Sequence, residues 1–197
     1  LRHYGVPQKL VNIIKESYVD FSCRVVHEGS LSGSFKVGTG VRQGCLLSPF
    51  LFLLAVNWIM KETTNNKNNG IQWTLTSQPD YLDFADDITL LSQNKQQIQD
   101  KTSNLKDISE TLGLKIHPGK TKVLRVQASS EEAIMLGDNA LENVDSFTYL
   151  GSILDKKGGV TADIRSRIGK ARQNFGRLRP VWKSPKLKTK TKLRIFN

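Results

Sequence analysis

Apolar residues recur at helical spacing at the start of the chain. After Pro7 they fall at steps of three and four, the pattern of one apolar helix face, and Pro is favoured in a first helical turn. The positions are Leu10, Val11, Ile14 and Tyr18. The pattern therefore predicts a helix that ends near Tyr18.

Extended patterns follow. Two β-rich stretches, 21–27 and 34–37, flank a segment that contains Gly and Ser, which predicts a hairpin. Three glycines then mark residues 38–44 as a loop. Ser48 before Pro49 is an N-cap and first-turn signal, and the nearly unbroken apolar run through about Lys61 predicts a helix buried on most sides.

The middle of the chain alternates between short apolar runs and polar connections. The Asn-rich residues 65–70 predict a surface loop. Strands are predicted at 71–75, 81–84 and 88–91, with residues 85–87 as the tight bend between the last two. An amphipathic helix ending at Gly113 is predicted from Ile98, Leu105, Ile108 and Leu112. Residues 114–116 and 121–126 then predict strands on either side of a turn at 117–119.

The last part of the chain changes character. Residues 147–151 predict one more strand, which leads to a turn at 158–159. Beyond it, apolar residues at steps of four and three predict a helix that Thr161 caps and Pro180 ends. They are Ile164, Ile168, Ala171, Phe175 and Leu178. The order of elements predicts an α+β body over 1–155 and a basic helical appendage over 156–197.

Composition and charge support this division of the chain into a body and a basic appendage. With 38% hydrophobic and 24% charged residues, the 197-residue chain has the makeup of a folded globular protein. Its net charge is +11, but residues 156–197 alone hold 14 Lys and Arg against one acid, Asp163, a net of +13. Residues 1–155 are left at −2. Such a basic segment predicts a polyanionic partner.

Cysteine usage and hydropathy exclude other classes. Cys23 and Cys45 lack C-x-x-C spacing, which argues against a zinc site and favours reduced core thiols. The apolar run 49–60 is shorter than the roughly 20 residues of a membrane span. No secretory signal pattern opens the chain, so an intracellular protein of nucleus or cytoplasm is expected. The first residue is Leu1, and we expect a fragment truncated at both ends.

Adjacent carboxylates in the bend at 85–87 are the sharpest chemical signal. At a bend, Asp86 and Asp87 can turn toward one site and ligate a hard cation such as Mg²⁺ through oxygen. Two such cations can clamp the attacking and leaving oxygens of a phosphoryl transfer. Asp is also a favoured turn residue, so the pair alone decides little.

Two further motifs have ordinary structural explanations when taken singly. Residues 40–49 form a glycine-bounded loop before a capped helix, in which Gly44 allows close approach of a ligand and Arg42 and Gln43 supply polar groups. Residues 112–122 combine a helix end, a turn and lysines of the kind that protect an edge strand.

Taken together and in order, these motifs resemble the reverse transcriptases of non-LTR (LINE-like) retrotransposons. The residues that carry the resemblance are Gly40-Val41-Arg42-Gln43-Gly44-Cys45, Leu47-Ser48-Pro49, Phe84-Ala85-Asp86-Asp87, Gly113-Leu114-Lys115-Ile116, Lys120-Thr121-Lys122 and Phe147-Thr148-Tyr149-Leu150-Gly151. Gly5-Val6-Pro7 also looks like the family's Gly-Ile-Pro. The resemblance implies a right-hand polymerase palm with partial fingers over 1–155 and an incomplete basic thumb over 156–197.

The resemblance also implies roles for individual residues in an RNA-directed DNA polymerase. Asp86 and Asp87 match the metal-binding pair, which holds two Mg²⁺ ions for which Mn²⁺ can substitute, and Lys120 matches a lysine near the leaving pyrophosphate. The nucleotide and template pocket is matched by Arg42, Gln43, Gly44, Phe84 and Ala85, and the primer grip by Tyr149, Leu150 and Gly151. Backbone contacts to nucleic acid are expected from Arg165, Arg167, Lys170 and Arg172. The implied partners are an RNA template, a DNA primer and deoxynucleoside triphosphates, and no membrane is implied. The resemblance also allows an endonuclease domain elsewhere in the full-length polyprotein.

Departures from the family pattern leave alternatives open. The family carries a further catalytic aspartate in a strand before the Gly-Ile-Pro helix, and this chain begins after that point, so we expect the chain alone to be inactive as a polymerase. Asp20 follows the first helix and does not take that role, and His117 stands where the family often has Asn. A remnant or maturase-like protein that grips RNA without polymerising is the alternative. A cyclase that shares the palm ranks last, because its Gly-Gly-Asp/Glu-Glu-Phe turn is missing.

Overall fold

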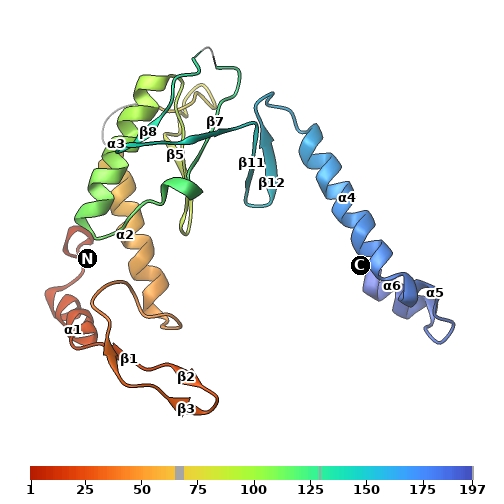
Figure 1. Ribbon diagram of the computed structural model, residues 1–197, viewed down its shortest axis with the longest axis horizontal. Coiled ribbons are helices and arrows are strands. Elements are labelled where there is room, and N and C mark those ends of the chain that lie inside the picture. Colours follow the sequence, from red (N-terminus) through yellow and green to blue (C-terminus); the bar gives the residue numbers. More distant parts are fainter. Residues whose placement is uncertain (65–68, 129, 197) are drawn as a thin grey trace. The chain divides into compact units, whose positions relative to one another are not determined.

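The computed structural model describes residues 1–64, 69–128 and 130–196, and its ribbon is drawn in Figure 1. The chain forms two compact units. The first comprises Leu1–Ile116 with Met135–Asp138, and the second comprises His117–Ile134 with Asn139–Asn197. The proposed division into palm and thumb near residue 155 is a functional one, and it stays a prediction.

The first unit opens with the short 3₁₀ helix η1 (Arg2–Tyr4) and α1 (Gln8–Tyr18), which Pro7 precedes as the N-cap residue. The predicted helix is thereby confirmed. Strands β1 (Ser22–Cys23) and β4 (Phe35–Lys36) pair antiparallel, as do β2 (Val26–His27) and β3 (Ser30–Leu31). The predicted hairpin is therefore present as two short ladders in line (Figure 1).

Helix α2 (Leu47–Thr63) follows the glycine loop and runs slightly beyond the predicted end. The predicted Ser48 cap is wrong, because the N-cap residue is Leu46 and no side chain caps the helix. Ser48 lies inside the first turn, where it is buried and its Oγ is 3.3 Å from the Tyr18 hydroxyl. The hydroxyl thus joins α1 to α2 instead of starting the helix.

The core of the first unit lies between α2 and α3 (Lys95–Thr111). It is built from Val56, Ile59, Met60 and Leu105. Strands β5 (Tyr81–Phe84) and β6 (Asp87–Leu90) form an antiparallel hairpin, and Tyr81, Ile88 and Leu90 pack against this core. Asn94 caps α3 by accepting a hydrogen bond from the Gln97 amide at 2.9 Å. These predicted elements are confirmed.

Two predicted strands of the first unit are wrong. Residues 71–75 form an irregular loop, in which the Trp73 amide donates to Ser77 O at 2.9 Å and Leu75 is fully exposed. The segment folds back on residues 77–79, where the Ile71 amide donates to Pro79 O at 3.1 Å, but Pro79 has no amide hydrogen with which to complete a ladder. Residues 114–116 are irregular as well, because Gly113 turns at φ 74° and the Leu114 amide donates back to Ser109 O on α3. Of the predicted loop at 65–70, residues 65–68 lie outside the described part of the chain.

The second unit holds the short helix η2 (Pro118–Lys120), which forms the predicted turn, and β7 (Lys122–Leu124), which pairs in parallel with β10 (Glu142–Val144). Strand β8 (Met135–Leu136) belongs to the first unit, where it lies against α3, and β9 (Asn139–Ala140) belongs to the second. The strand predicted at 147–151 is β11 (Ser146–Tyr149), and its hairpin partner β12 (Ser152–Asp155) was not predicted.

Three helices complete the second unit, α4 (Thr161–Arg177), α5 (Arg179–Lys183) and α6 (Thr189–Phe196). The predicted Thr161 cap is wrong, because the N-cap residue is Val160 without a side-chain bond, whereas Pro180 does follow the end of α4 as predicted. The apolar seam of α4 stays about half exposed at Ile164, Ile168 and Phe175. In the described ranges, no helix is long and apolar enough to cross a bilayer.

Candidate functional site

The adjacent aspartates lie at the tip of the β5–β6 hairpin in the first unit. Phe84 pairs with Asp87 across the ladder, so the turn consists of Ala85 and Asp86 alone and is one residue shorter than predicted. Ala85 has φ 56°, as the first central position of a two-residue hairpin turn requires. Such turns match the strand twist, but a positive φ costs a residue with a side chain about 1–2 kcal/mol.

Alternation along the strands separates the two faces of this hairpin. The pairs Tyr81 with Leu90 and Asp83 with Ile88 share the face that contributes to the core. The pairs Leu82 with Thr89 and Phe84 with Asp87 share the opposite face. Asp87 therefore points away from the core as the first residue of β6, while Asp86 occupies the turn itself.

Both carboxylates are available to a ligand. Asp86 and Asp87 are exposed, and within the described ranges neither side chain has a hydrogen-bond or ion-pair partner. No group of three or more His, Cys, Asp or Glu that could hold a metal occurs in that part of the chain. Mg²⁺ is commonly bound through one or two protein carboxylates, with substrate phosphates and water completing its shell. The exposed pair fits that donor set.

Arg42 in the glycine loop is held by the end of α1. Its guanidinium carbon lies 4.3 Å from the ring centroid of Phe21 and 5.1 Å from that of Tyr18, and its Nη2 donates to the Ser17 carbonyl. Its Nε is buried without a hydrogen-bond partner among the described residues. Arg42 thus anchors the loop, which leaves the exposed Gln43 and Gly44 as its open part.

The loop turns into α2 through Gly44 and Cys45. Gly44 has φ 80°, a conformation that glycine adopts without strain. The Leu47 amide and then the Ser48 hydroxyl and amide lower the pKa of the Cys45 thiol, with a smaller contribution from the Arg42 charge. These donors belong to the first turn of α2, where unpaired amides favour negative charge.

Lys120 and the residues matched to the primer grip belong to the second unit. Lys120 is exposed at the end of η2, and its amide donates to His117 O at 3.1 Å. Leu150 and Gly151 form the two-residue turn of the β11–β12 hairpin, closed by the pair Tyr149 with Ser152. Both turn residues have positive φ, 48° and 82°, as a type I′ turn requires.

The four basic residues singled out on α4 are all exposed, but they are not equivalent. Arg167 donates from Nε to Asp163 at 2.7 Å and from Nη2 to Ser152 Oγ at 2.8 Å. The Ile153 amide also donates to Asp163, and this bond and then Arg167 lower the pKa of that carboxyl. Arg167 therefore ties α4 to β12, whereas Arg165, Lys170 and Arg172 have no ion-pair partner within the described ranges.

Sequence reasoning left open whether Trp73 and Trp182 stack on bases. Trp182 stacks on Phe175 with centroids 5.2 Å apart, and its Nε1 donates to Phe175 O. Phe196 contacts both rings edge-on, so this trio holds α4, α5 and α6 together. Trp73 is exposed in the 71–75 loop.

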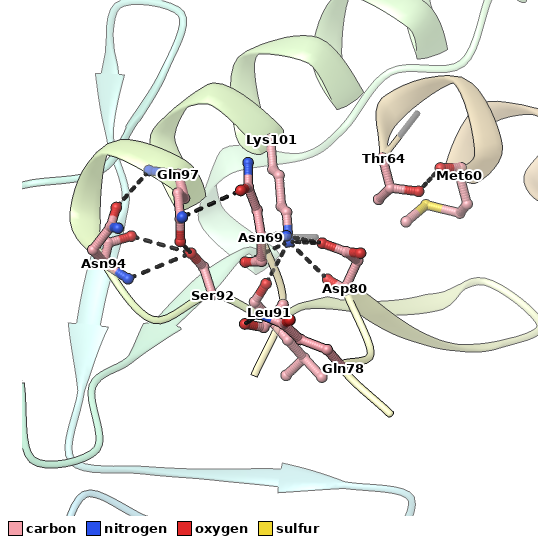
Figure 2. A network of polar contacts seen from close by, with 11 residues as sticks. Met60, Thr64, Asn69, Gln78, Asp80, Leu91, Ser92, Asn94, Gln97 and Lys101 are labelled. Atoms are coloured by element: carbon pink, nitrogen blue, oxygen red, sulfur yellow. Dashed lines mark hydrogen bonds and ion pairs between the residues drawn. The ribbon is translucent and has the colours of Figure 1, made fainter. Parts of the chain in front are cut away.

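Sequence reasoning missed a buried polar cluster at the open end of the aspartate hairpin, drawn in Figure 2. Lys101 on α3 is 3% exposed and pairs with Asp80, with 2.6 Å between Nζ and Oδ1. Lys101 stands among many polar residues of α3, and its residue type alone does not predict burial. The available signal was its helical spacing from Ile98 and Leu105, which places it on the apolar face.

Comparison with known proteins assigns the chain to a class. A family model described as reverse transcriptase (RNA-dependent DNA polymerase) matches residues 1–154. The chain therefore belongs to the reverse transcriptase family, and the predicted resemblance to the non-LTR retrotransposon enzymes is confirmed. A second model, a domain of unknown function, matches residues 174–197.

Among its relatives is the retrovirus-related Pol polyprotein from type-2 retrotransposable element R2DM of Drosophila melanogaster, 23% identical over 180 residues. Another is the Pol polyprotein from type-1 retrotransposable element R2 of Popillia japonica, 24% identical over 160 residues. These matches cover 86% and 81% of the chain, but only 17% and 25% of the relatives. The chain thus spans a quarter or less of the length of these curated relatives.

Proposed function

We propose that the chain contributes the aspartate hairpin to an RNA-templated DNA polymerase of a retrotransposable element. The observation that carries the proposal is the exposed pair Asp86, in the two-residue turn, and Asp87, directly after it, within the segment that the reverse transcriptase model matches. Residues 1–155 would supply partial fingers and palm, and residues 156–197 the start of a thumb.

The reaction is nucleotidyl transfer. The primer 3′ hydroxyl gives its proton to solvent water and attacks the α-phosphate of a deoxynucleoside triphosphate, and the bond to the leaving pyrophosphate breaks in line. Asp86 and Asp87 would hold Mg²⁺, which when bound stabilises charge on the attacking and leaving oxygens. At the exposed tip of the hairpin, both carboxylates can reach such a ligand without giving up a partner inside the protein.

The remaining residues act on binding and charge. Lys120, an exposed ammonium, would neutralise or protonate the leaving pyrophosphate. Arg42 would hold the loop whose Gln43 and Gly44 face the nucleotide and template, beside Phe84 and Ala85. The turn Tyr149–Gly151 would support the primer end. Arg165, Lys170 and Arg172 would contact phosphates, and Arg167 would position α4 for them.

The deciding assay is primer extension on an RNA template with Mg²⁺, using the protein of the reading frame that contains this chain. We expect Asp86→Asn and Asp87→Asn each to lower the rate at least about 100-fold, or about 2.7 kcal/mol of transition-state stabilisation. Asp138→Asn, an exposed acid of the same unit, is the matched control and should keep the wild-type rate. The prediction that the 197-residue chain alone does not extend a primer is tested in the same assay.

Binding of an RNA–DNA hybrid without extension by the unsubstituted protein would replace this proposal with the maturase-like alternative. Equal extension rates for wild type and Asp86→Asn would remove the turn aspartate from the site.

A further inference from the structure

The ammonium of Lys101 lies at the open end of the aspartate hairpin, beside Asp80 and Leu91 (Figure 2). Besides Asp80 Oδ1 at 2.6 Å, Nζ is within hydrogen-bond distance of Leu91 O at 2.6 Å, Asn69 O at 3.1 Å and Asp80 O at 3.3 Å. An ammonium has three donors, so these four acceptors more than satisfy it. Its burial is therefore fully compensated by polar partners.

The acceptors come from both strands of the hairpin. Asp80 directly precedes β5, and Leu91 directly follows β6. The Leu91 amide donates to Asp80 O at 2.8 Å, which closes the ladder at this end. One side chain of α3 thus binds both strands at the point where they leave the hairpin.

The carboxylate of Asp80 is held on its other side as well. Its Oδ1 accepts a hydrogen bond from the Asn69 amide at 3.2 Å. The Asn69 side-chain oxygen accepts in turn from Gln97 Nε2 at 3.2 Å, and Gln97 belongs to α3. Helix α3 therefore holds Asp80 twice, directly through Lys101 and indirectly through Gln97 and Asn69 (Figure 2).

Apolar packing cannot do this alone. Tyr81, Ile88 and Leu90 keep one face of the hairpin on the core, but hydrophobic contacts are non-directional and allow sliding and tilting. Hydrogen bonds from a fixed point define a direction. A buried ion pair is also a weak argument for stability, since apolar replacements of similar volume are often neutral. Orientation is the property that the cluster controls best.

We propose that Lys101 is a positioning residue that sets the orientation of Asp86 and Asp87 by fixing the open end of their hairpin on α3. Its catalytic consequence rests on the proposed function of the two aspartates. The structural part of the proposal, a fixed angle between the hairpin and α3, does not depend on that function.

The test measures that angle without metal or substrate. In the 197-residue chain with Cys23→Ser and Cys45→Ser, the Asp86→Cys variant carries a nitroxide at the hairpin tip. Paramagnetic broadening of the α3 backbone amides, read by NMR residue by residue, then reports where the tip lies. The test variant is Lys101→Met with Asp80→Leu, which removes the ion pair without leaving a buried charge. Lys106→Met, on the same helix but paired with Glu110 at the surface, is the matched control.

We expect the same residue-dependent broadening profile for the parent and Lys106→Met. The double variant should unfold at a lower temperature, because Leu91 O and Asn69 O lose their donor. While folded, it should lose most of the variation along α3, because the tip samples several tilts. A profile that coincides with the parent in the folded double variant would overturn the proposal.

If the double variant does not fold, Lys101→Arg decides. Its planar guanidinium keeps the charge but cannot place one atom among four acceptors, so a displaced profile supports the proposal and an unchanged one refutes it. A failure of primer extension in the unsubstituted protein would count against the proposed function and leave these profiles unaffected.

Discussion

The guanidinium of Arg42 lies 4.3 Å from the ring centroid of Phe21, with Tyr18 as its second aromatic neighbour. The segment that follows α1 therefore holds the glycine loop through a side chain that the sequence suggests as a direct ligand contact. This relationship changes what a substitution at Arg42 should do, since its first effect falls on the loop and only then on a bound nucleotide.

Replacing Arg42 should destabilise the loop. We expect Arg42→Ala to lower the free energy of unfolding by about 1–3 kcal/mol, because two cation–π contacts and the bond to Ser17 O are lost together. Arg24→Ala, at an exposed arginine, should change it by less than about 0.5 kcal/mol. Urea unfolding measures both, and equal values for the two variants would show that the stacking contributes nothing.

The positive φ of Ala85 gives a second prediction. Ala85→Val should lower the free energy of unfolding by about 1–2 kcal/mol, because a β-branched side chain tolerates φ 56° poorly. Ala85→Gly relieves the strain and should not destabilise the fold. Thermal unfolding of the two variants beside wild type provides the comparison. A Val variant as stable as the Gly variant would contradict the turn geometry.

The β11–β12 turn should respond to its own sequence preference. Asn is favoured over Leu at the first position of a type I′ turn, so Leu150→Asn should raise the free energy of unfolding by about 0.5–1 kcal/mol. Gly151→Ala should lower it by about 1–2 kcal/mol at φ 82°, although the added Cβ would touch no neighbouring atom. Denaturant titrations monitored by circular dichroism test both signs, and a destabilised Asn variant would exclude the I′ assignment.

Acid should weaken the attachment of α4 to β12. The Ile153 amide and then Arg167 lower the pKa of Asp163 from its usual 3.8, so its stabilising contribution is present above that pH. The contribution is lost as pH falls through the lower pKa of the folded state. We expect Asp163→Asn to flatten the decline of melting temperature below pH 4, and Asp138→Asn to leave it unchanged. A decline of the same slope in both variants would mean that Asp163 does not contribute to it.

The charge on α4 predicts salt-dependent binding of a nucleic-acid duplex. The triple variant Arg165→Gln, Lys170→Gln and Arg172→Gln should reduce the slope of log K against log salt by up to about 3, since each lost phosphate contact removes about 0.9. A matched triple variant at Lys9, Lys15 and Arg24 removes the same charge from the first unit. Titrations of a labelled RNA–DNA hybrid at several salt concentrations compare them. Equal slopes for the two triple variants would mean that binding depends on net charge and not on the position of the basic residues on α4.

Local patterns in the sequence predicted the elements whose stability is local. The helix from Lys95 to Thr111 and the hairpin at Tyr81–Leu90 follow their apolar periodicity closely. The strand predicted at 71–75 is absent because its facing segment, 77–79, contains Pro79, which cannot donate a ladder hydrogen bond. The partner strand 152–155 was missed because its pairing depends on a turn at Leu150, a residue that does not signal one.

The residues of the candidate site also differ in this respect, because some follow from local sequence patterns and others depend on tertiary contacts. Asp86 and Asp87 were selected as candidates because they are adjacent acids at a predicted bend, and the order of the motifs made the family recognisable. The anchoring of Arg42 and the burial of Lys101 depend on which side chains meet across the fold. Periodicity places Lys101 on the apolar face of α3, but neither periodicity nor composition encodes the acceptors that Lys101 meets or the aromatic rings that hold Arg42.

The two-residue connection between β5 and β6 makes chain length the constrained property at the tip of this hairpin. Side chains alternate along each strand, and Asp87 begins β6 directly after the turn. One inserted or deleted residue between Phe84 and Asp87 would force either a bulge or a register slip, and a slip would turn the carboxylate of residue 87 toward the core. Substitutions in this turn change its conformational energy, whereas insertions and deletions change which face of the hairpin carries the carboxylate of residue 87.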